Sequence, residues 1–166
     1  MEFSVKGPFD IKKERVGKGR YRLLFEDFWF SSSAIAKISE ERGVYVFAAK
    51  TGRGYAPLYV GKATKSFGKE AFNPTNKHKY SDAMLKYERC RPVMFFVTPP
   101  ERRGKVNVTA IDEVETFLIQ TAYNKNSEIQ NVKKTRMPSW SIRGTVRNEK
   151  RGAPKSAIEF RKAIGL

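Results

Sequence analysis

Cysteine and histidine are almost missing from this chain of 166 residues, which has one of each, Cys90 and His78. An intrachain disulfide is therefore excluded, and so is the usual zinc site built from several Cys and His side chains. A bound metal ion would have to be held by oxygen. No stretch approaches the roughly 18 consecutive apolar residues of a membrane-spanning helix. Residues 1–14 carry charges throughout, which is unlike a secretory signal. These absences predict a cytoplasmic protein with no membrane partner.

Positive charge is abundant: 33 Lys and Arg stand against 17 Asp and Glu, a formal net charge of +16. Hydrophobic residues make up 40% of the chain, enough for one domain with its own core. A positive excess of this size in a small protein indicates a polyanionic partner, of which nucleic acid is the leading candidate. The charge alone does not separate an enzyme from a simple binder, a ribosome-associated protein or a merely solvated surface.

The charge is unevenly distributed, and this predicts three segments. Residues 1–42 are nearly balanced and form an N-terminal lead-in segment, residues 43–131 form the core, and residues 132–166 form a basic C-terminal extension. The extension holds ten basic against two acidic residues. Its candidate nucleic-acid contacts are Lys133, Lys134, Arg136, Arg143 and Arg147. The alternative is a solvated, disordered tail, but Trp140 and a helix expected to begin near Pro154 favour order.

Periodicity predicts the elements of the core. A short helix over 34–43, capped by Ser33, leads into strands at 43–49 and 57–61 that form a hairpin. A polar loop and a helix over 80–90 follow, and the apolar centre of 91–100 is typical of a buried third strand. The strongest helix covers 109–124, with Thr109 and Asp112 at capping-box spacing. We therefore expect an α+β fold with a small, mostly antiparallel sheet of at least three strands flanked by helices.

Glu115 lies on the apolar stripe of that last helix, which also carries Ile111, Val114, Leu118, Ile119, Ala122 and Tyr123. Asp112 and Glu113 are expected to point elsewhere. A carboxylate on a buried face costs several kcal/mol unless a cation or hydrogen bonds compensate its charge. Glu115 should therefore meet something positive. The alternatives to a metal ion are an ordinary ion pair with a lysine and a position at the edge of the stripe that reaches solvent.

Two tyrosines of the hairpin, Tyr45 and Tyr59, occupy its adjacent strands. A phenol donates and accepts hydrogen bonds and, if its pKa is lowered, can remove a proton. The alternative is that both rings simply pack in the core with satisfied hydroxyls. Gly61 and Lys62 follow Tyr59 directly.

The ordered set of motifs resembles the GIY-YIG nuclease superfamily. The set consists of Gly43-Val44-Tyr45, then Tyr59-Val60-Gly61-Lys62, then Glu115 with Leu118-Ile119, and then an asparagine. The resemblance covers roughly residues 43–131. It implies a divalent-metal-dependent endonuclease that cuts DNA, most simply double-stranded DNA, with one Mg²⁺ or Mn²⁺ ion on Glu115. Tyr45 and Tyr59 would flank the scissile phosphate and help to activate water, while Lys62 would supply a positive charge near the leaving group. Gly61 would let the substrate backbone approach, unless it merely forms a turn at the strand end.

Other family positions map less directly. Lys69 stands where the family usually has an arginine, and a lysine neutralises phosphate without making the bidentate fork of a guanidinium. His78 and Tyr80 both fall in the loop where the family has a histidine or tyrosine, and His78 could equally be a solvent-exposed loop residue. Asn131, or else Asn124 or Asn126, would brace the site.

Three hypotheses therefore remain open. The first is the endonuclease. The second is a catalytically weak or inactive nucleic-acid-binding protein that retains the nuclease fold, favoured by the missing arginine. The third, a regulatory or toxin-like protein whose basic tail contacts another protein, has no supporting motif.

Overall fold

The computed structural model describes residues 1–166 apart from 19, 53, 101–106, 136–153 and 165–166. The chain divides into two compact units, Met1–Thr135 and Arg136–Leu166. The second unit contains α5 (Lys155–Ile164), which begins directly after Pro154. None of the described helices is long and apolar enough to cross a membrane.

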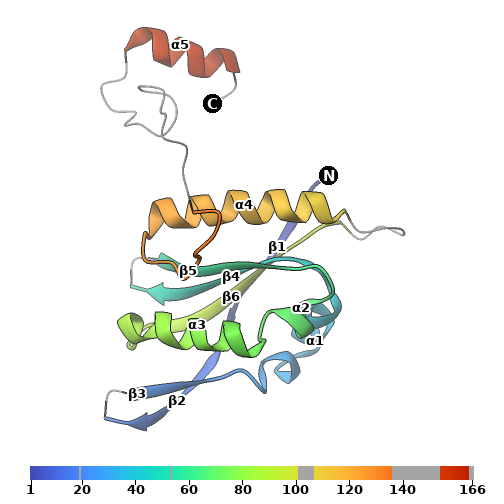
Figure 1. The fold of residues 1–166 in the computed structure, drawn as a ribbon, viewed down its shortest axis with the longest axis vertical. Helices are drawn as coiled ribbons and strands as arrows, with labels where there is room; N and C mark the ends of the chain where they lie inside the picture. Colours follow the sequence, from blue (N-terminus) through green and yellow to red (C-terminus); the bar gives the residue numbers. More distant parts are fainter. Residues whose placement is uncertain (19, 53, 101–106, 136–153, 165–166) are drawn as a thin grey trace. The chain divides into compact units, whose positions relative to one another are not determined.

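The first unit combines strands and helices in the following order (Figure 1). It contains β1 (Ser4–Asp10), β2 (Lys12–Gly17), β3 (Arg20–Leu24), the 3₁₀ turn η1 (Phe28–Phe30), α1 (Ser33–Glu40), β4 (Gly43–Thr51), β5 (Gly54–Ala63), α2 (Phe67–Glu70), α3 (Pro74–Met84), the 3₁₀ turn η2 (Leu85–Tyr87), β6 (Arg91–Thr98) and α4 (Val108–Lys125).

The strands form a four-stranded sheet in the order β1-β6-β4-β5 and a separate two-stranded sheet of β2 and β3. Every pairing is antiparallel. The predicted α+β class, the hairpin of β4 and β5 and the buried third strand β6 are therefore confirmed. Residues 1–42 add β1 to the edge of the main sheet beside β6. This segment is therefore part of the main sheet as well as a lead-in to residues 43–131.

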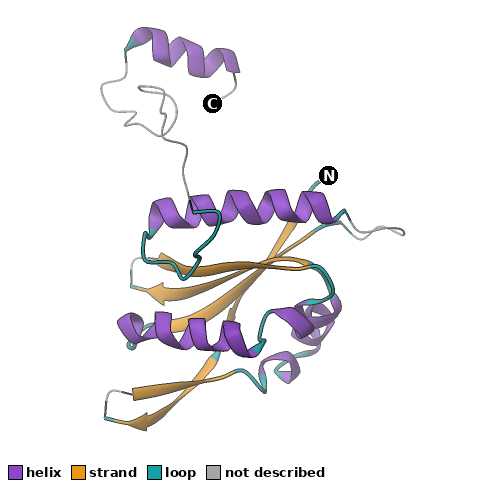
Figure 2. Cartoon of the chain, viewed as in Figure 1, coloured by secondary structure: helices purple, strands orange, loops and turns teal. Residues whose placement is uncertain are grey.

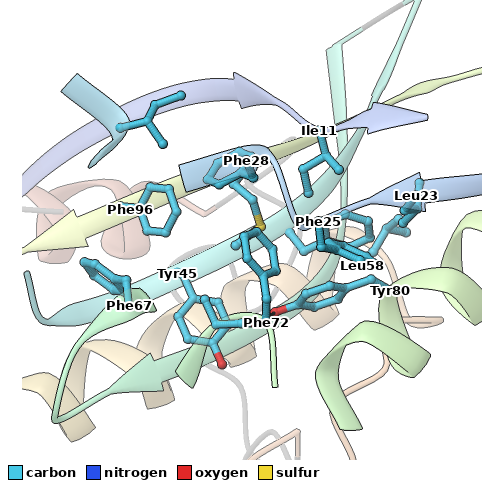
Figure 3. Packing of buried hydrophobic residues seen from close by; sticks show 14 of the residues in the cluster. Ile11, Leu23, Phe25, Phe28, Tyr45, Leu58, Phe67, Phe72, Tyr80 and Phe96 are labelled. Atoms are coloured by element: carbon cyan, nitrogen blue, oxygen red, sulfur yellow. Dashed lines mark hydrogen bonds between the residues drawn. The ribbon is translucent and has the colours of Figure 1, made fainter. Parts of the chain in front are cut away.

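Successive side chains of β4 point to opposite faces of the sheet, and each face buries its own cluster. Tyr45 and Phe47 join the larger cluster, which α1, α2, α3 and β3 cover (Figures 2 and 3). Val44 joins the smaller cluster, where Ile111 and Ile119 of α4 pack on the sheet. A β-bulge at Leu58 sets the register of β5, and it places both Leu58 and Tyr59 against the larger cluster.

Three helix starts differ from those predicted. α3 begins at Pro74 rather than near residue 80, because the Asn73 side chain accepts a hydrogen bond from the Asn76 amide (2.9 Å) and Pro74 suits the first helical position. α1 is capped by Ser32 rather than Ser33. α4 is capped by Asn107, whose side chain accepts from the Ala110 amide (2.9 Å), so the Thr109–Asp112 capping box is wrong.

Candidate active site

A cleft of about 390 Å³ opens along the outer edge of β5, between α3, α4 and the segment that follows α4. Ten residues line it: Tyr59 and Lys62 from β5, Lys79 from α3, Asp112, Glu115 and Ile119 from α4, and Asn131, Val132, Lys133 and Lys134 from the segment. The cleft therefore brings together Tyr59, Lys62, Glu115, Asn131, Lys133 and Lys134 of the residues proposed from the sequence.

Glu115 meets a cation, as its position on the apolar stripe of α4 predicted. Its side chain is only 13% exposed, and Oε2 lies 2.7 Å from Nζ of Lys134. The Nζ of Lys62 lies 3.6 Å from the same oxygen. The alternative of an ion pair between Glu115 and a lysine is thus observed in the structure.

Asp112 also faces the cleft, so the prediction that it points elsewhere is wrong. Its Oδ1 forms an ion pair with Lys62 and lies 2.8 Å from Nζ of Lys134. Asp112 and Glu115 are three residues apart on α4, which places their side chains on adjacent turns of one face. One ammonium group, that of Lys134, therefore bridges both carboxylates. Tyr123 is the other error on this helix, because it is 36% exposed rather than part of the buried stripe.

These ion pairs shift the pKa of Asp112 and the pKa of Lys134. Hydrogen bonds from Lys134 and Lys62 lower the pKa of Asp112 to about 2. Burial alone would lower the pKa of Lys134, but its hydrogen bonds to Asp112 and Glu115 outweigh burial and raise that pKa. At neutral pH the cleft accordingly holds a charged lysine against a charged Asp112.

The donor set of this corner suits a hard divalent cation. Two carboxylates already accommodate one positive group between them, and carboxylate oxygens are the ligands that Mg²⁺ and Mn²⁺ prefer. Among the described residues no group of three or more Asp, Glu, His or Cys gathers at one point. An ion in this cleft would therefore rest on Glu115, with Asp112 beside it.

The two tyrosines of the hairpin lie in different surroundings. Tyr59 lines the cleft, whereas Tyr45 is buried behind it, with ring centroids 6.3 Å apart. The Tyr45 hydroxyl accepts a hydrogen bond from Nδ2 of Asn76 (2.8 Å). Burial raises the pKa of Tyr45, and burial together with the negative charge of Glu115 raises the pKa of Tyr59. In this state both phenols are therefore protonated at neutral pH.

Gly61 makes room for the Tyr45 ring. It pairs with Tyr45 across the hairpin, within β5 rather than at a turn, and a Cβ at this position would overlap the ring and hydroxyl of Tyr45. Gly61 is buried, so the space that its missing side chain leaves is filled by the protein itself. The structure thus gives Gly61 a packing role, and the expected approach of substrate backbone at this residue stays a prediction.

Besides Tyr45 and Gly61, three further proposed residues lie outside the cleft lining. Tyr80 is fully buried, stacks on Phe47 with centroids 4.4 Å apart, and donates a hydrogen bond to the Ala71 carbonyl oxygen (2.8 Å). His78 lies exposed on α3, and Lys69 lies exposed on α2. His78 and Tyr80 are therefore helical rather than in a loop. Tyr80 reaches the site indirectly, because its ring packs edge-on against Tyr59 at 5.7 Å.

Lys79 is a cleft residue that the sequence did not indicate. Its Nζ lies 4.9 Å from the centroid of the Tyr59 ring, a cation–π contact. In the part of the chain that the structure describes, no acidic side chain forms an ion pair with Lys79, in contrast to Lys62 and Lys134. The start of α3 at the Asn73-Pro74 cap is the signal that would have placed Lys79 on a helix one residue before the buried Tyr80.

Asn131 braces the edge of β5 through two hydrogen bonds to the backbone of Val60. Its Oδ1 accepts from the Val60 amide (2.9 Å), and its Nδ2 donates to the Val60 carbonyl (2.7 Å). Asn126 donates to the Pro57 carbonyl, and the Gln130 amide donates to the Leu58 carbonyl. Residues 126–131 thus cover the open edge of the sheet and position Lys133 and Lys134 at the cleft.

The remaining predicted contacts, Arg136, Arg143 and Arg147, lie outside the described residues. The chain matches no protein-family model, no curated protein and no solved structure. The ordered motifs and the geometry of the cleft are therefore what supports a functional proposal.

Proposed function

We propose that the protein is a divalent-metal-dependent endonuclease of the GIY-YIG type that hydrolyses DNA phosphodiester bonds. One observation carries the proposal: Tyr59 and Glu115, which belong to distant motifs of the resemblance, line the same cleft. Lys62 and Asn131, two further residues of the resemblance, line the cleft with them.

The charges of the cleft suit a phosphodiester. Lys62, Lys79, Lys133 and Lys134 outnumber the two carboxylates, so the cleft attracts a polyanion while retaining a local acidic corner. Lys79 is not engaged with a carboxylate in the described chain and would contact a phosphate oxygen beside Tyr59. Lys133 is exposed at the rim, where it can neutralise a neighbouring phosphate.

Hydrolysis needs an oriented water molecule and compensation of the negative charge that develops on the phosphate. Mg²⁺ or Mn²⁺ on Glu115 would supply that Lewis acidity. Tyr59 would donate or accept a hydrogen bond with the attacking water. Compensation of the Glu115 charge would remove one of the two causes that raise the pKa of Tyr59. Lys62 would place its positive charge near the leaving oxygen. Tyr45, which packs beside Tyr59, would hold Tyr59 in position.

A specific observation favours a second candidate, a nucleic-acid-binding protein without cleavage. The carboxylate that would hold the metal, Glu115, already forms an ion pair with Lys134. Lys69, the residue at the family's arginine position, lies outside the cleft lining. Such a protein would bind duplex DNA through its lysines and leave it intact.

Nicking of supercoiled plasmid with and without Mg²⁺ or Mn²⁺ separates the two functions. We expect metal-dependent nicking by the wild-type chain and no nicking by Glu115→Gln. Glu113→Gln is the matched control, because Glu113 is an exposed carboxylate on the same helix and lies outside the cleft lining. The Glu115→Gln chain should stay folded, since Lys134 keeps its ion pair with Asp112.

Full activity of Glu115→Gln would refute the metal position. Duplex binding without nicking by the wild-type chain, in either metal, would favour the binding protein instead.

A further inference from the structure

The ammonium of Lys134 occupies the place where a divalent ion would bind. It lies 2.7 Å from Oε2 of Glu115 and 2.8 Å from Oδ1 of Asp112, so it contacts one oxygen of each carboxylate at once. A divalent ion on Glu115 would stand next to this positive charge, and two cations that share one carboxylate repel each other. The two occupants are therefore competitors.

The lysine is the partner that can leave. Asp112 and Glu115 are held on α4, in the middle of a regular helix of 18 residues. Lys134 lies instead in the irregular segment after that helix, next to the last residue of the first unit. Its backbone has φ of 63°, and among the described residues it is the one non-glycine residue with positive φ. This left-handed conformation is unfavourable for a lysine, and the two ion pairs help to maintain it.

Loss of Lys134 from the carboxylates would not leave Asp112 without a partner. Lys62 also forms an ion pair with Asp112 and lies 3.6 Å from Glu115. Release would leave the Lys134 ammonium at the mouth of a cleft that already carries Lys79 and Lys133. A phosphate group is the counter-ion that such a set of lysines would then bind.

We propose that Lys134 is an internal counter-cation that a divalent ion replaces, and that the released ammonium then binds substrate phosphate. Metal binding and duplex binding are then positively coupled, because each favours the state in which Lys134 has left the carboxylates. The proposal rests on the proposed function for the presence of a metal ion at Glu115. It adds a role for Lys134 that the motifs of the resemblance do not contain.

The first test is direct titration of Mn²⁺ into the full-length chain by calorimetry. Lys134→Gln keeps a side chain able to hydrogen-bond but removes the competing charge, and we expect it to bind Mn²⁺ about tenfold more tightly than the wild type. Lys133→Gln is the matched control, because it removes the same charge from the cleft without touching either carboxylate. The double variant Glu115→Gln, Lys134→Gln should lose the tight binding.

Thermal melting checks that Lys134→Gln is folded and measures its stabilisation by metal. Without metal, Lys134→Gln should melt below the wild type, because both carboxylates lose a counter-charge, and Mn²⁺ should raise its melting temperature by more than it raises that of the wild type. The second test measures duplex affinity with and without Ca²⁺. Ca²⁺ should tighten duplex binding by the wild type more than by Lys134→Gln.

The outcomes separate this inference from the proposed function. If the wild type binds Mn²⁺ through Glu115 and Lys134→Gln binds it no more tightly, the competition is refuted and the metal site stands. If neither chain binds Mn²⁺ in a manner that depends on Glu115, the metal site and the competition are both refuted.

Discussion

Tyr59 differs from Tyr45 and Tyr80, the two buried tyrosines of its cluster, because it reaches the cleft. Tyr45 and Tyr80 are 2% and 0% exposed, and their hydroxyls are engaged with Asn76 and with the Ala71 carbonyl. Tyr59 is half-buried, with Lys79 over its ring and Glu115 close enough to raise its pKa. A substitution at Tyr59 should therefore act on chemistry, whereas substitutions at the two buried tyrosines act on packing.

The Tyr59 hydroxyl can be removed while the ring is kept. Tyr59→Phe should lower the single-turnover rate of cleavage by at least about 100-fold, the usual scale for lost acid–base assistance, with little change in duplex affinity. Tyr55→Phe is the matched control, since Tyr55 lies on the same strand but packs against Phe95 and not in the cleft. An unaltered rate in Tyr59→Phe would place the reacting groups elsewhere.

At the scale of elements, the site depends on how the chain covers the edge of β5. An exposed edge strand presents unpaired amide and carbonyl groups, and here residues 126–131 satisfy several of them. The same segment delivers Lys133 and Lys134 to the cleft. The edge of the sheet and the acidic corner of α4 are thus connected through one short, irregular stretch of chain.

Asn131 is the residue that tests this connection. Asn131→Ala removes two hydrogen bonds to the backbone of Val60, and we expect a loss of roughly 1–3 kcal/mol in the free energy of unfolding. Urea denaturation measures it, with Asn124→Ala, an exposed position in the last turn of α4, as the control. Equal midpoints for both variants would show that the segment is held by other contacts.

At the scale of the whole molecule, the larger core cluster buries three phenols from β4, β5 and α3. Burial raises the pKa of Tyr45, Tyr59 and Tyr80 in the folded chain above the value of about 10 for a solvated tyrosine. The unfolded chain therefore releases these protons first as pH rises. The stabilisation is complete below about pH 10 and is lost progressively above it, as pH rises toward the raised pKa values.

Alkaline unfolding follows from this linkage. The free energy of unfolding should fall above about pH 10, by up to about 1.4 kcal/mol per pH unit for each phenol involved. Tyr80→Phe should be less stable at neutral pH, because it loses the bond to the Ala71 carbonyl, but its stability should fall less steeply with pH. Urea melts across this range measure both effects, with Tyr123→Phe on α4 as a control. Identical slopes for Tyr80→Phe and wild type would contradict the linkage.

Local patterns in the sequence were sufficient for the elements that carry the motifs. Apolar runs rich in β-branched and aromatic residues located β4, β5 and β6, and helical spacing located α4 with Glu115 facing inward. These features depend on neighbours within one or two turns of chain, which is why periodicity reveals them. Asn131 could be located because it follows the last core helix, although its bonds to Val60 could not.

The tertiary structure decided which groups share the cleft. Lys134 and Lys79 reach it only because the segment after α4 runs along β5 and because α3 begins at Pro74. Asp112 forms ion pairs with two lysines from distant positions, while Gly61 and Tyr80 are buried by aromatic rings from other strands and helices. Such contacts join residues far apart in the chain, and their energies depend on distance and burial in the folded molecule, which no local pattern encodes.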